Sequence, residues 1–202
     1  MALLMVHLLA ARNWAQMHER YLNDPDFYLG AISPDAIHIR DKGDKSNKNR
    51  IHLNNWLSPD PDEVVLYWKK HHTPFDIGYG IHVLTDAQWV PRYRHRIPQL
   101  VLPGGKTDME AYYRDSVSTD YRLYHKMGTP LFDLVERGSA PKNHPLLSEH
   151  EIAEWQRVKA REYRKCDKPD YYAKYLTTSY VLEFLIDSML LMEKTYRRHK
   201  HE

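Results

Sequence analysis

The chain has almost no cysteine and no long hydrophobic run. Its single cysteine, Cys166, excludes an intramolecular disulfide and a zinc site built from several thiolates. Any bound metal would therefore be held by nitrogen and oxygen atoms. No apolar run reaches the roughly 18 residues that suggest a membrane-spanning helix, so we expect no membrane span.

An excess of one charge is also lacking. Lys and Arg total 29 against 27 Asp and Glu, so no strong field attracts nucleic acid, and we expect no nucleic-acid partner. The apolar run 2–11 has signal-peptide length, but no basic segment precedes it and His7 interrupts it. The run continues amphipathically through Trp14 and Tyr21, so we interpret it as a first core helix. This interpretation predicts a cytoplasmic protein.

No alternating pattern of useful length predicts a strand, and no repeat is visible. Helical spacing dominates and predicts an all-α fold: one domain, 1–202, of about seven or eight helices around a central helix. Pro91 is expected to end that central helix, and Ser148 with Glu151 predicts a capping box. The expected helical segments are 2–22, 27–32, 58–71, 75–90, 108–127, 131–137, 149–164 and 170–198, with loops at 41–49 and 98–105.

Histidine, by contrast, is abundant. The 13 histidines are roughly three times what an average usage of about 2% gives, which favours metal or acid–base chemistry. The run Gly-Tyr-Gly-Ile-His-Val-Leu-Thr-Asp, 78–86, places His82 and Asp86 four residues apart on one face of an apolar helix. A buried carboxylate is costly unless a cation or hydrogen-bond donors compensate, so the pair predicts a metal ion. An ordinary hydrogen-bonded helical pair is the alternative.

Three further segments present candidate metal ligands from apolar surroundings. Asp35 follows Phe-Tyr-Leu-Gly-Ala-Ile-Ser-Pro, with the role of a helix N-cap as its alternative. His52 lies in Arg-Ile-His-Leu after a polar loop, and the alternative is a solvent-exposed loop residue. His7 lies between Val6 and Leu8, where a lone histidine is more often a satisfied core residue.

Together these segments resemble the bacterial zinc-dependent phospholipase C-like family, including its short cytoplasmic relatives. The resemblance rests on the helix with His7, the segment ending at Asp35, the loop ending at His52 and the 78–86 run, about the first 90 residues. It implies an all-helical fold and a zinc site formed by Asp35, His52, His82 and Asp86, with Asp86 bridging to a second metal near His7.

The chain departs from that family downstream of the 78–86 run. Full phospholipases of this type bind three zinc ions, one of them through a His, His, Glu set. Histidines 95, 125, 144 and 150 and Glu149 form no compact His-x-x-x-Glu pair, and the processed N-terminus that ligates metal in secreted members has no counterpart. We therefore expect one or two ions, zinc first, with iron or manganese as alternatives that suit the same ligands.

A site of this kind predicts a hydrolase of phosphoesters that uses a metal-activated water and a small phosphorylated substrate. Asp35 is the expected acceptor of the water's proton, and Asp120 is a candidate for supporting the ligands or holding a second metal. Exposed helical charge is the alternative for Asp120. Five cationic side chains are candidates for binding the substrate phosphate: Arg40, Lys48, Arg50, Arg92 and Arg94.

Two other functions compete with this hypothesis. A catalytically degenerate helical scaffold would act as a binding or interaction module. A His-Asp-superfamily phosphohydrolase, also all-helical, ranks lower because the chain contains no adjacent His-Asp dipeptide. The Met- and Leu-rich C-terminal helix predicts a homo-oligomer in either case.

Overall fold

The computed structural model describes residues 3–40, 46–54 and 60–201, and in these ranges the chain is built from helices with no β-strand. Eleven α-helical segments are present there, seven of them nine residues or longer. The all-α prediction is confirmed, but the expected seven or eight helices are too few, because short segments such as α2, α4 and α5 were not predicted as separate helices. The elements are α1 Leu4–Ala15, α2 Glu19–Leu22, α3 Pro25–Gly30, η1 Ser33–Ala36, α4 Ile37–Arg40, α5 Ser46–Ile51, α6 Pro61–Lys70, α7 Pro74–Arg96, η2 Pro98–Leu100, α8 Met109–Leu123, η3 Tyr124–Gly128, α9 Thr129–Arg137, α10 Glu149–Lys165 and α11 Thr178–His201.

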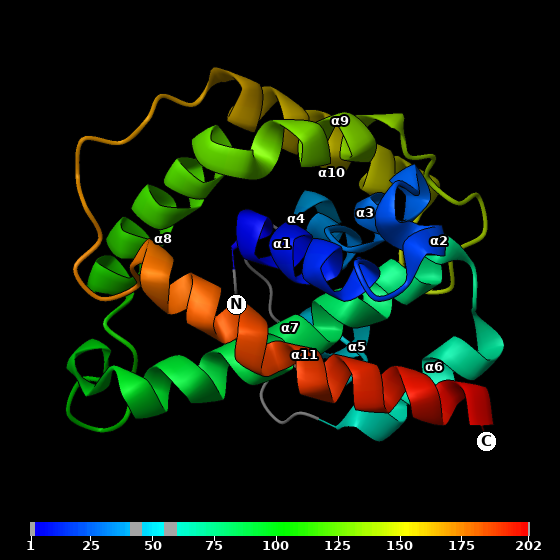
Figure 1. Cartoon of the computed structure of the whole chain (residues 1–202), viewed down its shortest axis with the longest axis horizontal. Helices are drawn as coiled ribbons and strands as arrows, with labels where there is room; N and C mark the ends of the chain where they lie inside the picture. The colour runs from blue at the N-terminus through cyan, green and yellow to red at the C-terminus, as the bar shows by residue number, and fades with distance from the viewer. Residues whose placement is uncertain (1–2, 41–45, 55–59, 202) are drawn as a thin grey trace.

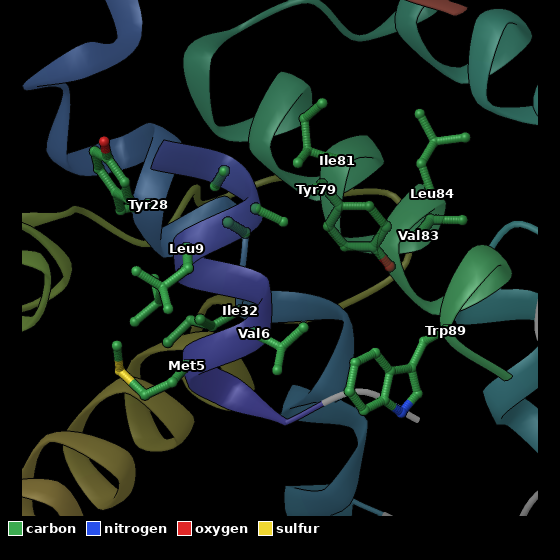
Figure 2. Close-up of a cluster of buried hydrophobic side chains, with 14 of the residues drawn as sticks. Met5, Val6, Leu9, Tyr28, Ile32, Tyr79, Ile81, Val83, Leu84 and Trp89 are labelled. Carbon is green, nitrogen blue, oxygen red and sulfur yellow. The ribbon is translucent and has the colours of Figure 1, made fainter. Parts of the chain in front are cut away.

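The helices pack around one hydrophobic core. Figure 1 shows α1 in the middle of the array, where it packs against α7, α8 and α11. Apolar side chains of α1 and α7 gather in this core together with Tyr28 and Ile32, as Figure 2 shows. Met5, Val6, Leu8, Ala10 and Ala11 of α1 are completely buried, which explains why this segment reads as apolar on nearly every side. No helix in the described part of the chain is long and apolar enough to cross a membrane.

The prediction of one continuous helix over 2–22 is wrong. Helix α1 ends at Ala15, and His18 leaves the helical conformation at φ −138° before α2 begins. The ring of His18 packs against Trp14 and lies 2.7 Å from a carboxylate oxygen of Glu193 on α11. This contact to a distant helix stabilises the turn between α1 and α2. The local sequence contains no pattern that predicts it.

The other boundaries differ for similar reasons. Helix α7 continues through Pro91 to Arg96, because Tyr93 and Ile97 beyond the proline are buried in the core. Residues 170–177 are not helical, since the buried Asp115 carboxylate accepts hydrogen bonds from the backbone N–H groups of Tyr175 and Leu176. The loop expected at 41–49 is wrong in its second half, because α5 begins at Ser46. Residues 41–45 lie outside the described residues, and so do 58–59, the start of the expected 58–71 helix.

Candidate metal centre

Helix α7 carries two of the predicted ligands, and small residues bring it close to its neighbours. A Cβ atom on Gly78 would lie 2.0 Å from the carbonyl oxygen of Phe27, and one on Gly80 would lie 2.4 Å from the Trp68 ring. Only glycine permits this approach of α7 to α3 and α6. The close packing sets the carbonyl of Ala31, at the end of α3, within 2.8 Å of His82 Nδ1.

His82 and Asp86 share a buried face of α7, as the spacing predicted. A hydrogen bond between them is not formed, because His82 Nε2 lies 3.9 Å from the nearer Asp86 oxygen. A carbonyl oxygen can only accept, so His82 Nδ1 donates its proton to Ala31 and Nε2 keeps a lone pair. Burial, and then the neighbouring His7, hold the pKa of His82 well below its usual value, so the ring is neutral. This tautomer, fixed by a backbone carbonyl, is the one that metal-binding histidines adopt.

His52 has the same arrangement at the end of α5. Its Nδ1 donates to the carbonyl oxygen of Lys48 at 3.0 Å, and the ring is fully buried rather than solvent-exposed. Its Nε2 lies 3.4 Å from an Asp86 oxygen and 3.7 Å from an Asp35 oxygen. His52 therefore presents an imidazole nitrogen to both carboxylates.

Asp35 enters the same cluster from the short turn η1. The N-cap of that turn is Ile32, so Asp35 does not serve as its cap. One Asp35 oxygen lies 3.4 Å from Lys48 Nζ and 3.9 Å from His38 Nε2. Burial opposes ionisation of this carboxyl, but the Lys48 ammonium outweighs it and holds the pKa of Asp35 well below its usual range. Asp35 is therefore an ionised, buried carboxylate.

His7 completes the cluster from α1. It is 1% exposed, its ring stacks on His82 with centroids 3.6 Å apart, and its Nε2 lies 3.5 Å from an Asp86 oxygen. Among the described residues neither ring nitrogen of His7 has a hydrogen-bond partner. A satisfied core histidine, the alternative considered from the sequence, does not leave both nitrogens unbonded.

The donor set fits a divalent metal ion. Ligand atoms of His7, Asp35 and His82 lie within 4.8 Å of one another, and so do those of His52, His82 and Asp86. Two atoms bound to one tetrahedral zinc at its usual bond lengths lie about 3.3 Å apart, close to the separations between these imidazole nitrogens and carboxylate oxygens. Unbonded nitrogens and buried carboxylates are what such an ion would satisfy. The described residues meet this spacing at no other place.

The predicted phosphate-binding cations do not gather at the cluster, with one exception. Lys48 is buried beside Asp35, whereas Arg50 and Arg94 are exposed. Two others are engaged elsewhere. Arg40 pairs with Glu151 on α10 at 2.6 Å, and Arg92 pairs with Asp187 on α11.

Asp120 is buried on α8 and so is not an exposed helical charge. It accepts hydrogen bonds from the backbone N–H of Met5, at 2.9 Å, and from the Tyr163 hydroxyl. Burial raises the pKa of its carboxyl to about 7, although those hydrogen bonds favour the charged form. Asp120 thus anchors the start of the helix that carries His7 and supports the cluster without joining it.

Sequence reasoning missed His38 and the ionic role of Lys48. His38 lies three residues after Asp35, the i, i+3 spacing that can place two side chains on one face. Its side chain is 36% exposed, against 10% for Asp35 and 2% or less for the other four candidate ligands. The cluster therefore approaches the surface along Asp35 and His38.

Of the four histidines considered for a further metal set, His95 and His150 are exposed, and the other two have partners outside the cluster. His144 Nε2 lies 2.9 Å from the Tyr67 hydroxyl, which donates to Asp76, and His125 lies against Cys166.

Comparison with protein-family models, with curated proteins and with solved structures finds no match for this chain. The residues of this cluster are therefore the basis for assigning a function.

Proposed function

We propose that the chain is a metal-dependent hydrolase of phosphoesters, similar to the zinc-dependent phospholipase C-like family. One observation carries the proposal. Five candidate metal-ligand side chains from α1, η1, the turn after α5, and α7 converge in a buried cluster. The ring nitrogens of His7 and Nε2 of His82 have no hydrogen-bond partner among the described residues. The side chains that would hold the ion are His7, Asp35, His52, His82 and Asp86.

Zinc suits this mixture of imidazole and carboxylate best, and iron or manganese are alternatives. A divalent ion held there supplies Lewis acidity, which acidifies water toward a pKa of about 7 and polarises a phosphoryl oxygen. The protein contributes position and charge. His82 and His52 are held in the ligating tautomer by two backbone carbonyls. Asp35, the most exposed of the five ligands, is kept ionised by Lys48 and is placed to accept a proton from water.

Elemental analysis of the purified protein tests this proposal. We expect a stoichiometric divalent metal in the wild type and its loss from His82→Ala. His144→Gln is the matched control, because this histidine is partly buried outside the cluster and bonds to Tyr67. Absence of metal from the wild type, or unchanged content in His82→Ala, would favour the degenerate helical scaffold instead.

Activity then separates a hydrolase from a metal-stabilised scaffold. A generic phosphodiester and a generic phosphomonoester are offered to the metal-loaded protein with and without chelator. We expect chelator-sensitive release of the leaving group from at least one of them. Stoichiometric metal without turnover of either substrate would retain the metal centre and contradict the phosphoesterase.

A further inference from the structure

The cluster contains a buried cation that belongs to the protein itself. Lys48 is 4% exposed, and its ammonium lies 3.4 Å from the same Asp35 oxygen that faces His52. A buried lysine is rare unless its charge is compensated, and here Asp35 compensates it. A second metal ion bridged through this oxygen would have to take a position that the Lys48 ammonium already occupies.

The other side of the cluster offers few donors for a second ion. His52 and His82 lie beside Oδ2 of Asp86, and among the described residues His7 is the histidine beside Oδ1, at 3.5 Å. Asp120, the remaining buried carboxyl near α1, is engaged by the Met5 N–H and the Tyr163 hydroxyl. His7 also lies within 4.8 Å of ligand atoms of Asp35 and His82, but His82 offers Nε2 alone and Asp35 is paired with Lys48, so a second ion would have to share ligands with the first.

Charge balance points the same way. Histidines bind metals as neutral imidazoles, so Asp35, Asp86 and Lys48 together leave one negative charge. One divalent ion turns this into one positive charge, and a second ion would turn it into three. Burying three uncompensated positive charges is far costlier than burying one.

We infer that the centre binds one metal ion, that Lys48 serves as its second cation, and that the loaded site takes an anionic phosphate group on the side of Asp35 and His38. This inference rests on the proposed function and specifies its metal count and the charge of its substrate. The ammonium supplies the electrostatic attraction that a second metal would otherwise give to the phosphate.

The test counts metal and measures phosphate binding separately. Zinc is supplied in excess, weakly bound zinc is removed by dialysis, and bound zinc is counted by elemental analysis. Binding of inorganic phosphate is then measured by calorimetry on the zinc-loaded protein. We expect one zinc per chain in the wild type and in Lys48→Arg, with phosphate affinities within about threefold of each other.

Lys48→Met is expected to keep one zinc and to bind inorganic phosphate at least tenfold more weakly. Lys106→Met is the control, because this lysine is exposed in the loop between η2 and α8 and belongs to no part of the cluster. Phosphate affinity in Lys48→Met equal to that of the wild type would overturn the role of the ammonium.

The wild-type count keeps the inference testable even if Lys48→Met does not fold. Two zinc ions per wild-type chain would overturn the single-metal centre and leave the proposed function standing. No zinc at all would overturn the proposed function itself, so the two failures are distinguishable.

Discussion

At the scale of single residues, the hydrogen bonds that are already made decide which atoms are left for a metal. Two backbone carbonyls, of Ala31 and Lys48, occupy Nδ1 of His82 and of His52 and leave Nε2 of both rings directed at carboxylates. Three imidazoles surround Asp86, since His7 lies beside it as well as His52 and His82, each within 3.9 Å of its oxygens. Asp86 is therefore the residue whose charge should matter most for metal affinity.

Replacement of Asp86 by asparagine tests that role. Asp86→Asn keeps the shape of the side chain and removes the charge, so we expect metal affinity to fall at least tenfold, about 1.4 kcal/mol, while the fold persists. Competition with a chromophoric chelator measures the affinity. Asp76→Asn is the control, because Asp76 is buried on the same helix but caps its N-terminus and bonds to Tyr67. An equal loss in both variants would contradict the account.

The pKa of Asp120 makes a prediction about stability and pH. The folded-state pKa of about 7 lies above the usual value of 3.8 for this carboxyl, so the native state binds the proton more tightly than the unfolded chain. Stability contributed by this group is complete below pH 4 and is lost as the pH rises to 7, by roughly 4 kcal/mol at most. Tyr163 and the Met5 N–H contact the carboxyl, and the charges of Lys159 and Glu162 act on it.

Urea unfolding between pH 4 and pH 8 measures how steeply the free energy of unfolding falls as the pH rises. We expect Asp120→Asn to flatten this dependence in that range, since asparagine does not titrate. A wild type and an Asp120→Asn variant with parallel profiles would show that another group controls the pH dependence.

The residues of the cluster could be singled out from the sequence, because each is a polar residue in apolar surroundings. His82 and Asp86 follow from helical spacing, and Asp35, His52 and His7 from their segments. Lys48 and Arg92 could not be told apart, since both are cations near polar residues. Only tertiary packing directs the first to Asp35 and the second to Asp187.

At the scale of elements, the site depends on how closely α7 approaches α3. The carbonyl of Phe27 lies where a side chain on Gly78 would begin, and the His82 to Ala31 hydrogen bond lies one helical turn further along α7. Gly78→Ala should therefore push the two helices apart. Overpacking of this kind costs roughly 1–3 kcal/mol, and loss of the Ala31 bond should weaken metal binding as well.

Urea unfolding and chelator competition on Gly78→Ala check both effects. Gln88→Ala is the control on the same helix, because its side chain bonds to carbonyls of α7 and α11 and does not enter the cluster. A Gly78→Ala variant with wild-type stability and metal affinity would contradict the close-packing argument.

Element boundaries were predictable where the signal is local. The capping box of Ser148 and Glu151 at the start of α10 is confirmed, since both of its hydrogen bonds are present. The continuation of α7 past Pro91 and the late start of α11 were not predictable. They depend on Tyr93, Ile97 and Asp115 meeting partners that are distant in the sequence.

At the scale of the whole molecule, α11 leaves an apolar stripe uncovered. Leu182, Ile186 and Leu190 recur every four residues and are 38%, 71% and 79% exposed. Contiguous exposed apolar residues of this kind mark interaction surfaces. Antiparallel packing of a second copy on this stripe would bring Ile186 of one chain to Leu190 of the other and cover these exposed side chains.

The homo-oligomer expected from the C-terminal helix stays a prediction, and light scattering tests it. We expect a dimer, with Leu190→Lys weakening association at least tenfold, which is about 1.4 kcal/mol. Leu102→Lys changes an exposed leucine away from α11 and should leave the mass unchanged. A wild type that is monomeric at all accessible concentrations would contradict this use of the stripe.

The central claim, that one buried cluster of histidines and aspartates binds a metal ion, is tested most directly by an anomalous diffraction map of zinc-loaded crystals at the zinc absorption edge. We expect one strong peak per chain, surrounded by His7, Asp35, His52, His82 and Asp86 and adjacent to the Lys48 ammonium. A map with no peak among these side chains, or with its peak at another place, would contradict it.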